Sequence, residues 1–225
     1  MRRRSAWVIP ALAALLWLAP LAQVFAAGFE VRPVLVETAD GLGTLTVSNP
    51  GATRLYIQGT LYRWSYDTDG VQVLAAVPNV IVSPPATWIK PGSEYRFRLK
   101  VPQAAPGQEL SFRLLLSEVP TRDTITNGAV MMTVTQSIPV FSEGKSLKSP
   151  SLSATLVGST LLIHNSGGRH VRIAQLMQDG RVVKSGLVGY ALSGSLLAVH
   201  LKIPIHPGRI EFTTDLGLQT LVVTE

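Results

Sequence analysis

The sequence predicts an all-β protein, and three observations support this class. From Phe29 onward, apolar residues alternate with polar ones in short runs, and no run sustains the period of a helix. Turn residues such as Asn49-Pro50-Gly51 separate the runs. Roughly seven such runs in the first half are typical of an immunoglobulin-like sandwich, in which two sheets bury one face each against the other.

The strands expected in the first sandwich follow one another between clear turn signals. Asp67-Thr68-Asp69-Gly70 ends the aromatic-rich run that closes near Trp64, and a loop from Pro102 to Gly107 precedes a leucine-rich run. After a first strand within Phe29 to Leu35, the expected strands are residues 44–48, 55–64, 71–77, 95–101, 110–116 and 129–141.

A polar, turn-rich segment from Ser142 to Pro150 predicts a linker. After it, short runs of alternating apolar and polar residues resume. Six further runs there indicate a second, smaller sandwich. The expected organisation is a signal peptide at 1–26, an N-terminal immunoglobulin-like domain at 27–142, a linker at 143–149 and a C-terminal β-sandwich at 150–225.

The first residues are typical of a secretory leader. Arg2 to Arg4 precede an apolar run from Ala6 to Ala19, and Val24-Phe25-Ala26 gives a small-residue exit, so we expect cleavage after Ala26. A membrane anchor is the alternative, but Pro10, Pro20 and Gln23 shorten the apolar run below a spanning length. The mature chain is therefore expected to be exported and not inserted in a membrane.

Composition excludes several classes of function. The formal net charge is +6, but three of the cations lie in the leader, which has no acid, so the mature chain has half this excess and little support for a nucleic-acid partner. The chain has no cysteine, which excludes disulfides, thiol catalysis and cysteine-ligated zinc.

No catalytic or metal-binding pattern is present in the sequence. Nucleophile elbows and phosphate-binding loops are absent, and the acids are scattered over predicted strands and loops. The four histidines lack the spacing of a zinc site; they are His164, His170, His200 and His206. The sequence therefore predicts no enzyme and no cofactor.

Several short motifs follow a fixed order along the first predicted sandwich. They are Leu61-Tyr62-Arg63-Trp64-Ser65, Asp69-Gly70, Val82-Ser83-Pro84-Pro85, Ile89-Lys90-Pro91-Gly92, Phe97-Arg98-Leu99, Leu114 to Pro120 and Gln136 to Phe141. In this order they resemble the PapD-like periplasmic chaperones of chaperone-usher pili. The Tyr62-Arg63-Trp64 run and the Ile138 to Phe141 ending resemble the archaic branch, which serves spore-coat-U-like or Csu-like pilins.

The resemblance implies two sandwiches in a boomerang arrangement and a non-enzymatic role. A pilus subunit lacks the last strand of its own sandwich, so an apolar groove and two strand edges are exposed and prone to aggregate. A chaperone of this family, acting in the periplasm, lends one of its strands, a process called donor-strand complementation, and delivers the subunit to an outer-membrane usher. The implied partners are pilus subunits and an usher.

Residues 129–138 are the expected donor strand. Alternation places Val130, Met132 and Val134 on one face, with Ile138 in phase two steps further. Alternation alone fits equally well with a face that packs inside the domain's own core. The resemblance favours the donor assignment, with a polar loop from Thr121 to Gly128 ahead of the strand.

The resemblance also implies a cationic anchor for the terminal carboxylate of the subunit. Arg32 on the first strand is the candidate, although an exposed arginine without a partner is an equal alternative. The family's second cation falls near Pro139, which cannot supply a charge. Arg98 and Lys100 are other candidate cations.

An interdomain ion network is implied as well. Glu109 and Asp215 stand where the family has acids, whereas Glu143 stands at the basic position. Lys145 or Lys148 is expected to supply the cation from the linker; the alternative is a domain angle held by packing alone.

Two other functions fit an exported immunoglobulin-like chain. One is a structural pilus subunit or adhesin that polymerises, although such subunits are usually a single incomplete sandwich with an N-terminal extension. The other is an enzyme or carbohydrate-binding module on the same fold, since fold does not dictate function. Size-exclusion chromatography distinguishes a discrete chaperone from a fibre-forming subunit.

Overall fold

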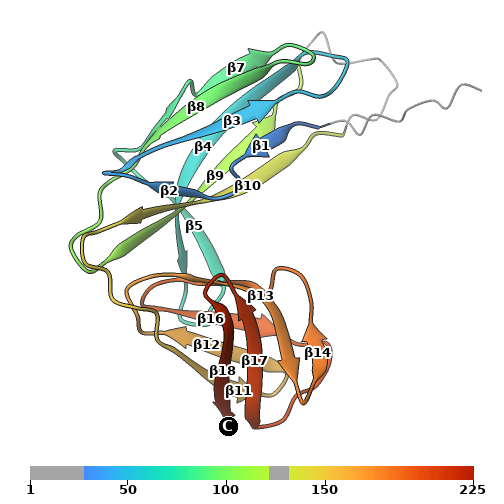
Figure 1. Cartoon of the computed structure of the whole chain (residues 1–225). Helices are drawn as coiled ribbons and strands as arrows, with labels where there is room; N and C mark the ends of the chain where they lie inside the picture. Colours follow the sequence, from blue (N-terminus) through green and yellow to red (C-terminus); the bar gives the residue numbers. More distant parts are fainter. Residues whose placement is uncertain (1–27, 122–131) are drawn as a thin grey trace, which may run out of the picture.

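The computed structural model describes residues 28–121 and 132–225, which form two β-sandwich units joined by a linker at one side (Figure 1). Strands β1 to β10 build the first unit, and β11 to β18 build the second. Within these two ranges the chain forms no helix, so nothing there meets the length and apolarity that a membrane-spanning helix needs. The predicted all-β fold is confirmed, while the predicted leader lies outside the described residues.

The first unit contains two facing sheets. Its first two strands, β1 and β2, lie in different sheets. Sheet A has the order β1 (Glu30–Arg32), β3 (Leu42–Ser48), β8 (Glu94–Lys100) and β6 (Ile81–Ser83). Sheet B has the order β2 (Val36–Thr38), β10 (Thr135–Glu143), β9 (Glu109–Glu118), β4 (Leu55–Tyr66) and β5 (Gln72–Ala76), with β7 (Ala86–Ile89) also paired to β4. All neighbours are antiparallel except β2 and β10.

Alternation along the strands places the apolar residues between the two sheets. Phe97 and Leu99 of β8 point inward from sheet A, and Leu114, Leu116 and Val140 point inward from sheet B. These side chains are fully buried, and burial of each contributes about 1.5–3 kcal/mol to folding. The core therefore fixes which face of β9 and β10 points outward.

The second unit is built from one sheet that folds over on itself, so that two layers enclose its core. Its strands are β11 (Leu152–Val157), β12 (Thr160–Asn165), β13 (Val171–Gln178), β14 (Arg181–Lys184), β15 (Gly189–Ala191), β16 (Ser195–His200), β17 (Gly208–Thr214) and β18 (Gly217–Thr224). The path β14-β13-β17-β18-β11-β12-β16 folds over so that β15, paired with β13, contacts β16. Ile163, Ile173, Ile210 and Phe212 are sealed in the space it encloses.

The last strand of the first unit differs from its predicted extent. The expected strand began at residue 129, whereas β10 begins at Thr135. Its neighbour β9 ends at Glu118, which donates its backbone N–H to the carbonyl of Val134 (2.9 Å). Since β9 offers no residue opposite 132 and 133, this stretch has no strand to pair with in the described chain; residues 129–131 lie outside it.

The turn before β3 depends on a glycine. Gly41 has φ +75°, and a Cβ at this position would overlap the carbonyl oxygen of Val101. Gly92 has a similar φ of +65° but open space around it. We expect Gly92→Ala to cost only the left-handed backbone penalty of about 1–2 kcal/mol, and Gly41→Ala to cost clearly more because the backbone must also move.

Urea unfolding of the two single variants measures this difference in the free energy of unfolding. Equal losses would show that the contact between Gly41 and Val101 relaxes without cost.

Candidate functional site

Strand β10 is open along one side for part of its length. It pairs with β9 from Thr135 to Glu143, but with β2 only from Val140 to Ser142. Among the described residues, no strand pairs with the β2 side of residues 135–139. An unpaired strand edge of this kind is a template for an added strand.

The register determines which backbone groups face this open edge. Val134 accepts a bond from β9, and in antiparallel pairs alternate residues bond toward the same neighbour. The backbone groups of residues 134, 136 and 138 therefore bond toward β9. Thr135 and Ser137 direct both their N–H and their C=O toward the open edge. Pro139 directs only its carbonyl outward, because proline has no N–H. The edge thus offers a short ladder that ends at Pro139.

The four predicted donor side chains have different surroundings. Met132 is 82% exposed, and Val134 is half-buried against the core of the first sandwich. Ile138 is only 4% exposed and belongs to that core, so its assignment to a free donor face is wrong. Ile138 lies between the two sheets of the first unit. The core ends at Val134, and Met132, which precedes it in the chain, is exposed. Val130 lies outside the described residues.

A cation missed by the sequence analysis lies beside Pro139. In the register of β9 and β10, Arg113 stands directly opposite Pro139, so their side chains share the outward face of sheet B. The Arg113 Cζ atom lies 3.7 Å from the centroid of the Trp64 ring and 5.5 Å from that of Tyr190. In the sequence, the signal for this cation was a single arginine, Arg113, among the apolar residues of the strand predicted at 110–116. Only the register of β9 and β10 shows that it lies beside Pro139.

Arg113 has no anionic partner in the described structure. Its Nε atom is buried and makes no hydrogen bond, and burial lowers the pKa of the guanidinium. Arginine nevertheless keeps its charge in proteins. The side chain lines a hollow of about 600 Å³ between the β4–β5 hairpin and the second unit, together with Tyr66, Tyr190 and His200. A desolvated cation that faces a hollow is suited to bind an anion.

The structure does not bring Arg32 to this place. Arg32 lies in sheet A, opposite Thr46 of β3, and its side chain is paired with Glu30 of its own strand (2.9 Å). Both partners are largely exposed, at 76% and 54%, so this ion pair contributes little to stability. Arg98 and Lys100 also lie in sheet A, on β8.

Aromatic side chains join the two units. Trp64 and Phe141 of the first unit meet Tyr190 of the second in one buried cluster, with Trp64 and Tyr190 edge to face at 5.5 Å between centroids. The Phe141 ring is stacked on His170 at 3.5 Å. The Tyr66 hydroxyl donates to the carbonyl of Tyr190 (2.9 Å), and burial raises the pKa of Tyr66 to about 12.

A buried polar pair lies beneath this cluster. The two carboxylate oxygens of Glu109 accept from the backbone N–H of His170 (3.0 Å) and contact its Nδ1 atom (2.8 Å). The two side chains are 0% and 1% exposed. The predicted interdomain role of Glu109 therefore has a structural basis, but its partner is a histidine that no sequence signal identified.

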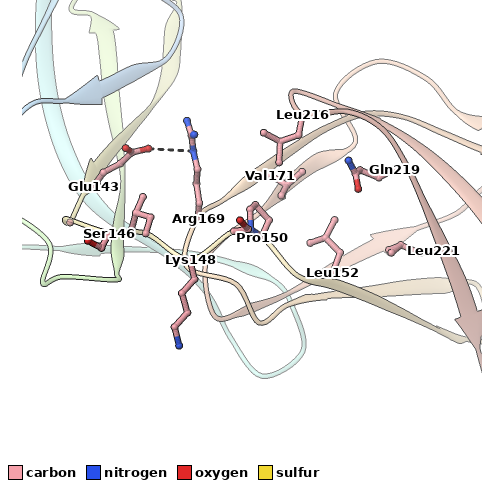
Figure 2. A pocket seen from close by; sticks show the side chains of 13 residues that line it. Glu143, Ser146, Lys148, Pro150, Leu152, Arg169, Val171, Leu216, Gln219 and Leu221 are labelled. Atoms are coloured by element: carbon pink, nitrogen blue, oxygen red, sulfur yellow. Dashed lines mark ion pairs between the residues drawn. The ribbon is translucent and has the colours of Figure 1, made fainter.

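An arginine of the second unit bridges two acids of the first. Arg169 donates to Glu37 (2.7 Å), and its Nε atom lies 3.3 Å from Glu143 (Figure 2). Partial burial acts to lower the pKa of Arg169, but Glu143 and Glu37 together outweigh it, so the pKa is raised. The acid at position 143 thus pairs with a cation from the other unit.

The lysines expected to supply this cation lie elsewhere. Lys148 points away from Glu143 (Figure 2). Lys145 is exposed, and only its backbone carbonyl has a partner among the described contacts, the N–H of Gly107 (2.7 Å). Asp215 accepts from the backbone N–H of Arg172 (3.0 Å) inside the second unit, so this contact is not interdomain. The predicted contacts of Lys145 and Asp215 are corrected in favour of Arg169 and His170.

The linker side of the junction contains a hollow of about 610 Å³ (Figure 2). Leu152, Val171, Leu216 and Leu221 form one wall, and Arg169 lies at its edge. In the described part of the chain, no three metal-ligating side chains come together there or elsewhere.

Comparison with known proteins gives a family and a set of similar structures. The model of the family "Pili and flagellar-assembly chaperone, PapD N-terminal domain" matches residues 31–148, which is just over half of the chain. No curated protein matches the sequence.

Three solved structures illustrate the similarity of fold. The CsuC–CsuE chaperone–tip adhesion subunit pre-assembly complex from archaic chaperone-usher Csu pili of Acinetobacter baumannii matches with a TM-score of 0.73 and 23% identity, over 88% of this chain and 100% of that chain. The Salmonella enterica SafA pilin in complex with the SafB chaperone gives 0.66 and 17%, over 87% and 96%. The E. coli chaperone DraB gives 0.63 and 18%, over 87% and 95%.

The contacts at the junction differ in their expected contribution to stability. His170→Leu leaves the buried Glu109 carboxylate with one partner instead of two, so we expect a loss of about 3 kcal/mol in the free energy of unfolding. Arg169→Gln is the matched control, because it removes part-exposed ion pairs worth under about 1 kcal/mol.

Urea unfolding measures both losses, and small-angle X-ray scattering reports whether the units separate. A small loss in His170→Leu, equal to that of the control, would mean that water replaces the histidine at no cost.

Proposed function

Because the chain belongs to the family of pili and flagellar-assembly chaperones with a PapD N-terminal domain, we propose that it binds pilus subunits through the open edge of β10. The subunit would be held in the periplasm and passed to an outer-membrane usher, without catalysis. The solved chaperone complexes with a tip adhesion subunit and with a pilin support this class of partner.

One observation supports the proposal most directly. Residues 132 and 133 precede β10 and lie beyond the end of β9, and the side of residues 135–139 that faces away from β9 has no neighbour among the described strands. The exposed Met132 follows in this same stretch. A strand edge next to an exposed apolar side chain is what a sandwich lacking one strand needs.

The half-buried Val134 explains how the two proteins would join. It packs at the margin of the chaperone core, and Met132, two residues away, shares its face in an extended strand. A subunit that pairs with the edge would place its apolar groove over Met132 and continue the core past Val134. Each buried side chain contributes about 1.5–3 kcal/mol, which offsets the cost of association only together with backbone pairing.

Arg113 completes the site as the anchor for a carboxylate. It occupies the position next to Pro139, where the family's lysine is missing, and it carries a buried nitrogen with no partner. The terminal carboxylate of a subunit paired along β10 would satisfy this nitrogen and the charge. Methionine at position 132 adapts to differently shaped grooves, which suits a chaperone with several subunits.

A charge at position 132 tests the donor face. Met132→Asp is expected to abolish recovery of the subunit, because an aspartate cannot enter an apolar groove without a large desolvation cost. The control Val222→Asp changes another exposed apolar residue, 68% exposed, on the second unit. The measurement is co-purification with a co-expressed pilus subunit that the wild-type chain retains.

Both variants should unfold at the wild-type urea concentration, because both positions are exposed. Normal recovery of the subunit with folded Met132→Asp would exclude the proposed donor face.

The anchor is tested by a double-mutant cycle. Arg113→Gln should weaken binding of the natural subunit about tenfold or more, since charge-assisted bonds contribute about 1.5–3 kcal/mol. A subunit extended by glycines beyond its natural C-terminus should bind both chaperones equally, because its carboxylate no longer reaches the site. The affinities are measured by competition for the subunit, with the exposed Arg181→Gln as control.

If Arg113→Gln weakens both subunits by the same factor, the arginine acts through the fold and not through the carboxylate.

A further inference from the structure

The outward face of sheet A carries cations in ordered rows. The registers of β1, β3, β8 and β6 place outward residues side by side across the sheet, and these residues are exposed or half-exposed. The rows are Arg32, Thr46 and Arg96; then Thr44, Arg98 and Ser83; then Leu42, Lys100 and Ile81.

The cations of β8 have no acidic partner in the described structure. Arg96, Arg98 and Lys100 take part in none of its ion pairs, and alternate residues of a strand stand roughly 7 Å apart. The acids of this face, Glu30 and Glu94, both lie at one end of it. The remaining rows therefore present positive charge among hydroxyl groups.

Two further features shape this face. A shallow hollow of about 280 Å³ is lined by Ser83, Pro84, Tyr95, Arg96 and Arg98. In the last row, Lys100 stands between Leu42 and Ile81, two apolar side chains that are 59% and 52% exposed.

We propose that the face formed by Arg96, Arg98, Lys100, Leu42 and Ile81 docks on the anionic surface of a phospholipid bilayer. Arginine and lysine attract phosphate headgroups, and the apolar pair enters the boundary between headgroups and acyl chains. An acidic polypeptide without apolar side chains would satisfy the cations alone. A bilayer offers phosphate and hydrocarbon side by side, which matches the row of Leu42, Lys100 and Ile81.

The position of the face makes this docking compatible with the rest of the molecule. Sheet A turns its inner face to sheet B, whose outward face carries Arg113 and the aromatic junction. A bilayer on the outward face of sheet A therefore leaves the open edge of β10 and the second unit uncovered. The proposal does not depend on the proposed function.

Vesicle sedimentation with the mature chain tests the docking. Vesicles of phosphatidylcholine with a minority of phosphatidylglycerol should bind the protein at low salt, and vesicles of phosphatidylcholine alone should not. The triple variant Arg96→Gln, Arg98→Gln, Lys100→Gln should lose roughly a hundredfold in partitioning, about fivefold for each cation. The matched control Arg181→Gln, Lys202→Gln, Arg209→Gln removes three exposed cations of the second unit and should bind normally.

Leu42→Ser with Ile81→Ser should weaken binding while the net charge is unchanged. Equal losses in the triple variant and its matched control would overturn the proposal, because net charge alone would then explain binding. Inorganic phosphate that releases the protein from the vesicles more strongly than chloride does at equal ionic strength would also overturn the proposal, in favour of a binding site for a small anion. Subunit recovery by the triple variant is measured in parallel, so loss of docking and loss of chaperone function are read separately.

Discussion

The structure depends on how the backbone of β10 is paired. A buried or half-buried strand needs a partner for each N–H and C=O, and β10 has strand partners along one whole side and along part of the other. β9 covers one side from Thr135 onward, β2 covers the other side from Val140 to Ser142, and residues 135–139 are left with an uncovered side. The same strand thus belongs to the core at one end and to the surface at the other. Water or an added strand must satisfy the backbone groups of residues 135–139 on this uncovered side.

The junction of the two units acts on this same strand. Phe141 of β10 is stacked on His170. Glu109, which stands opposite Glu143 in the register of β9 and β10, contacts the Nδ1 atom of the same histidine. The second unit is therefore anchored within a few residues of the open edge. Arg113 lies between the two, over Trp64 and opposite Pro139. Because these contacts share strands, the edge, the cation and the domain angle are fixed relative to one another.

Sequence patterns predicted what is local and missed what depends on distant neighbours. The alternation in β8 and β9 gave the strands and their buried faces, and the order of motifs indicated the family that the comparison confirms. The phase of Val134 and Ile138 is the same, so alternation could not show that Ile138 is sealed in the core whereas Val134 lies at its margin; the end of β9 at Glu118, opposite Val134, decides this difference. Arg113, Arg169 and His170 act through partners far away in sequence, which only the folded chain brings together.

An open edge is a hazard as well as the proposed binding site, and the sequence of β10 limits the hazard. Thr135, Gln136 and Ser137 make the uncovered stretch polar, and Pro139 ends the outward ladder after two complete residues. Two chains pairing edge to edge here would gain few backbone bonds and bury little apolar surface. In the proposed complex, Met132 and Val134 would add stability only when the partner brings an apolar groove of its own. Selectivity would then arise from the order of residues along one strand, with backbone groups that accept any extended chain and side chains that stabilise only an incomplete sandwich.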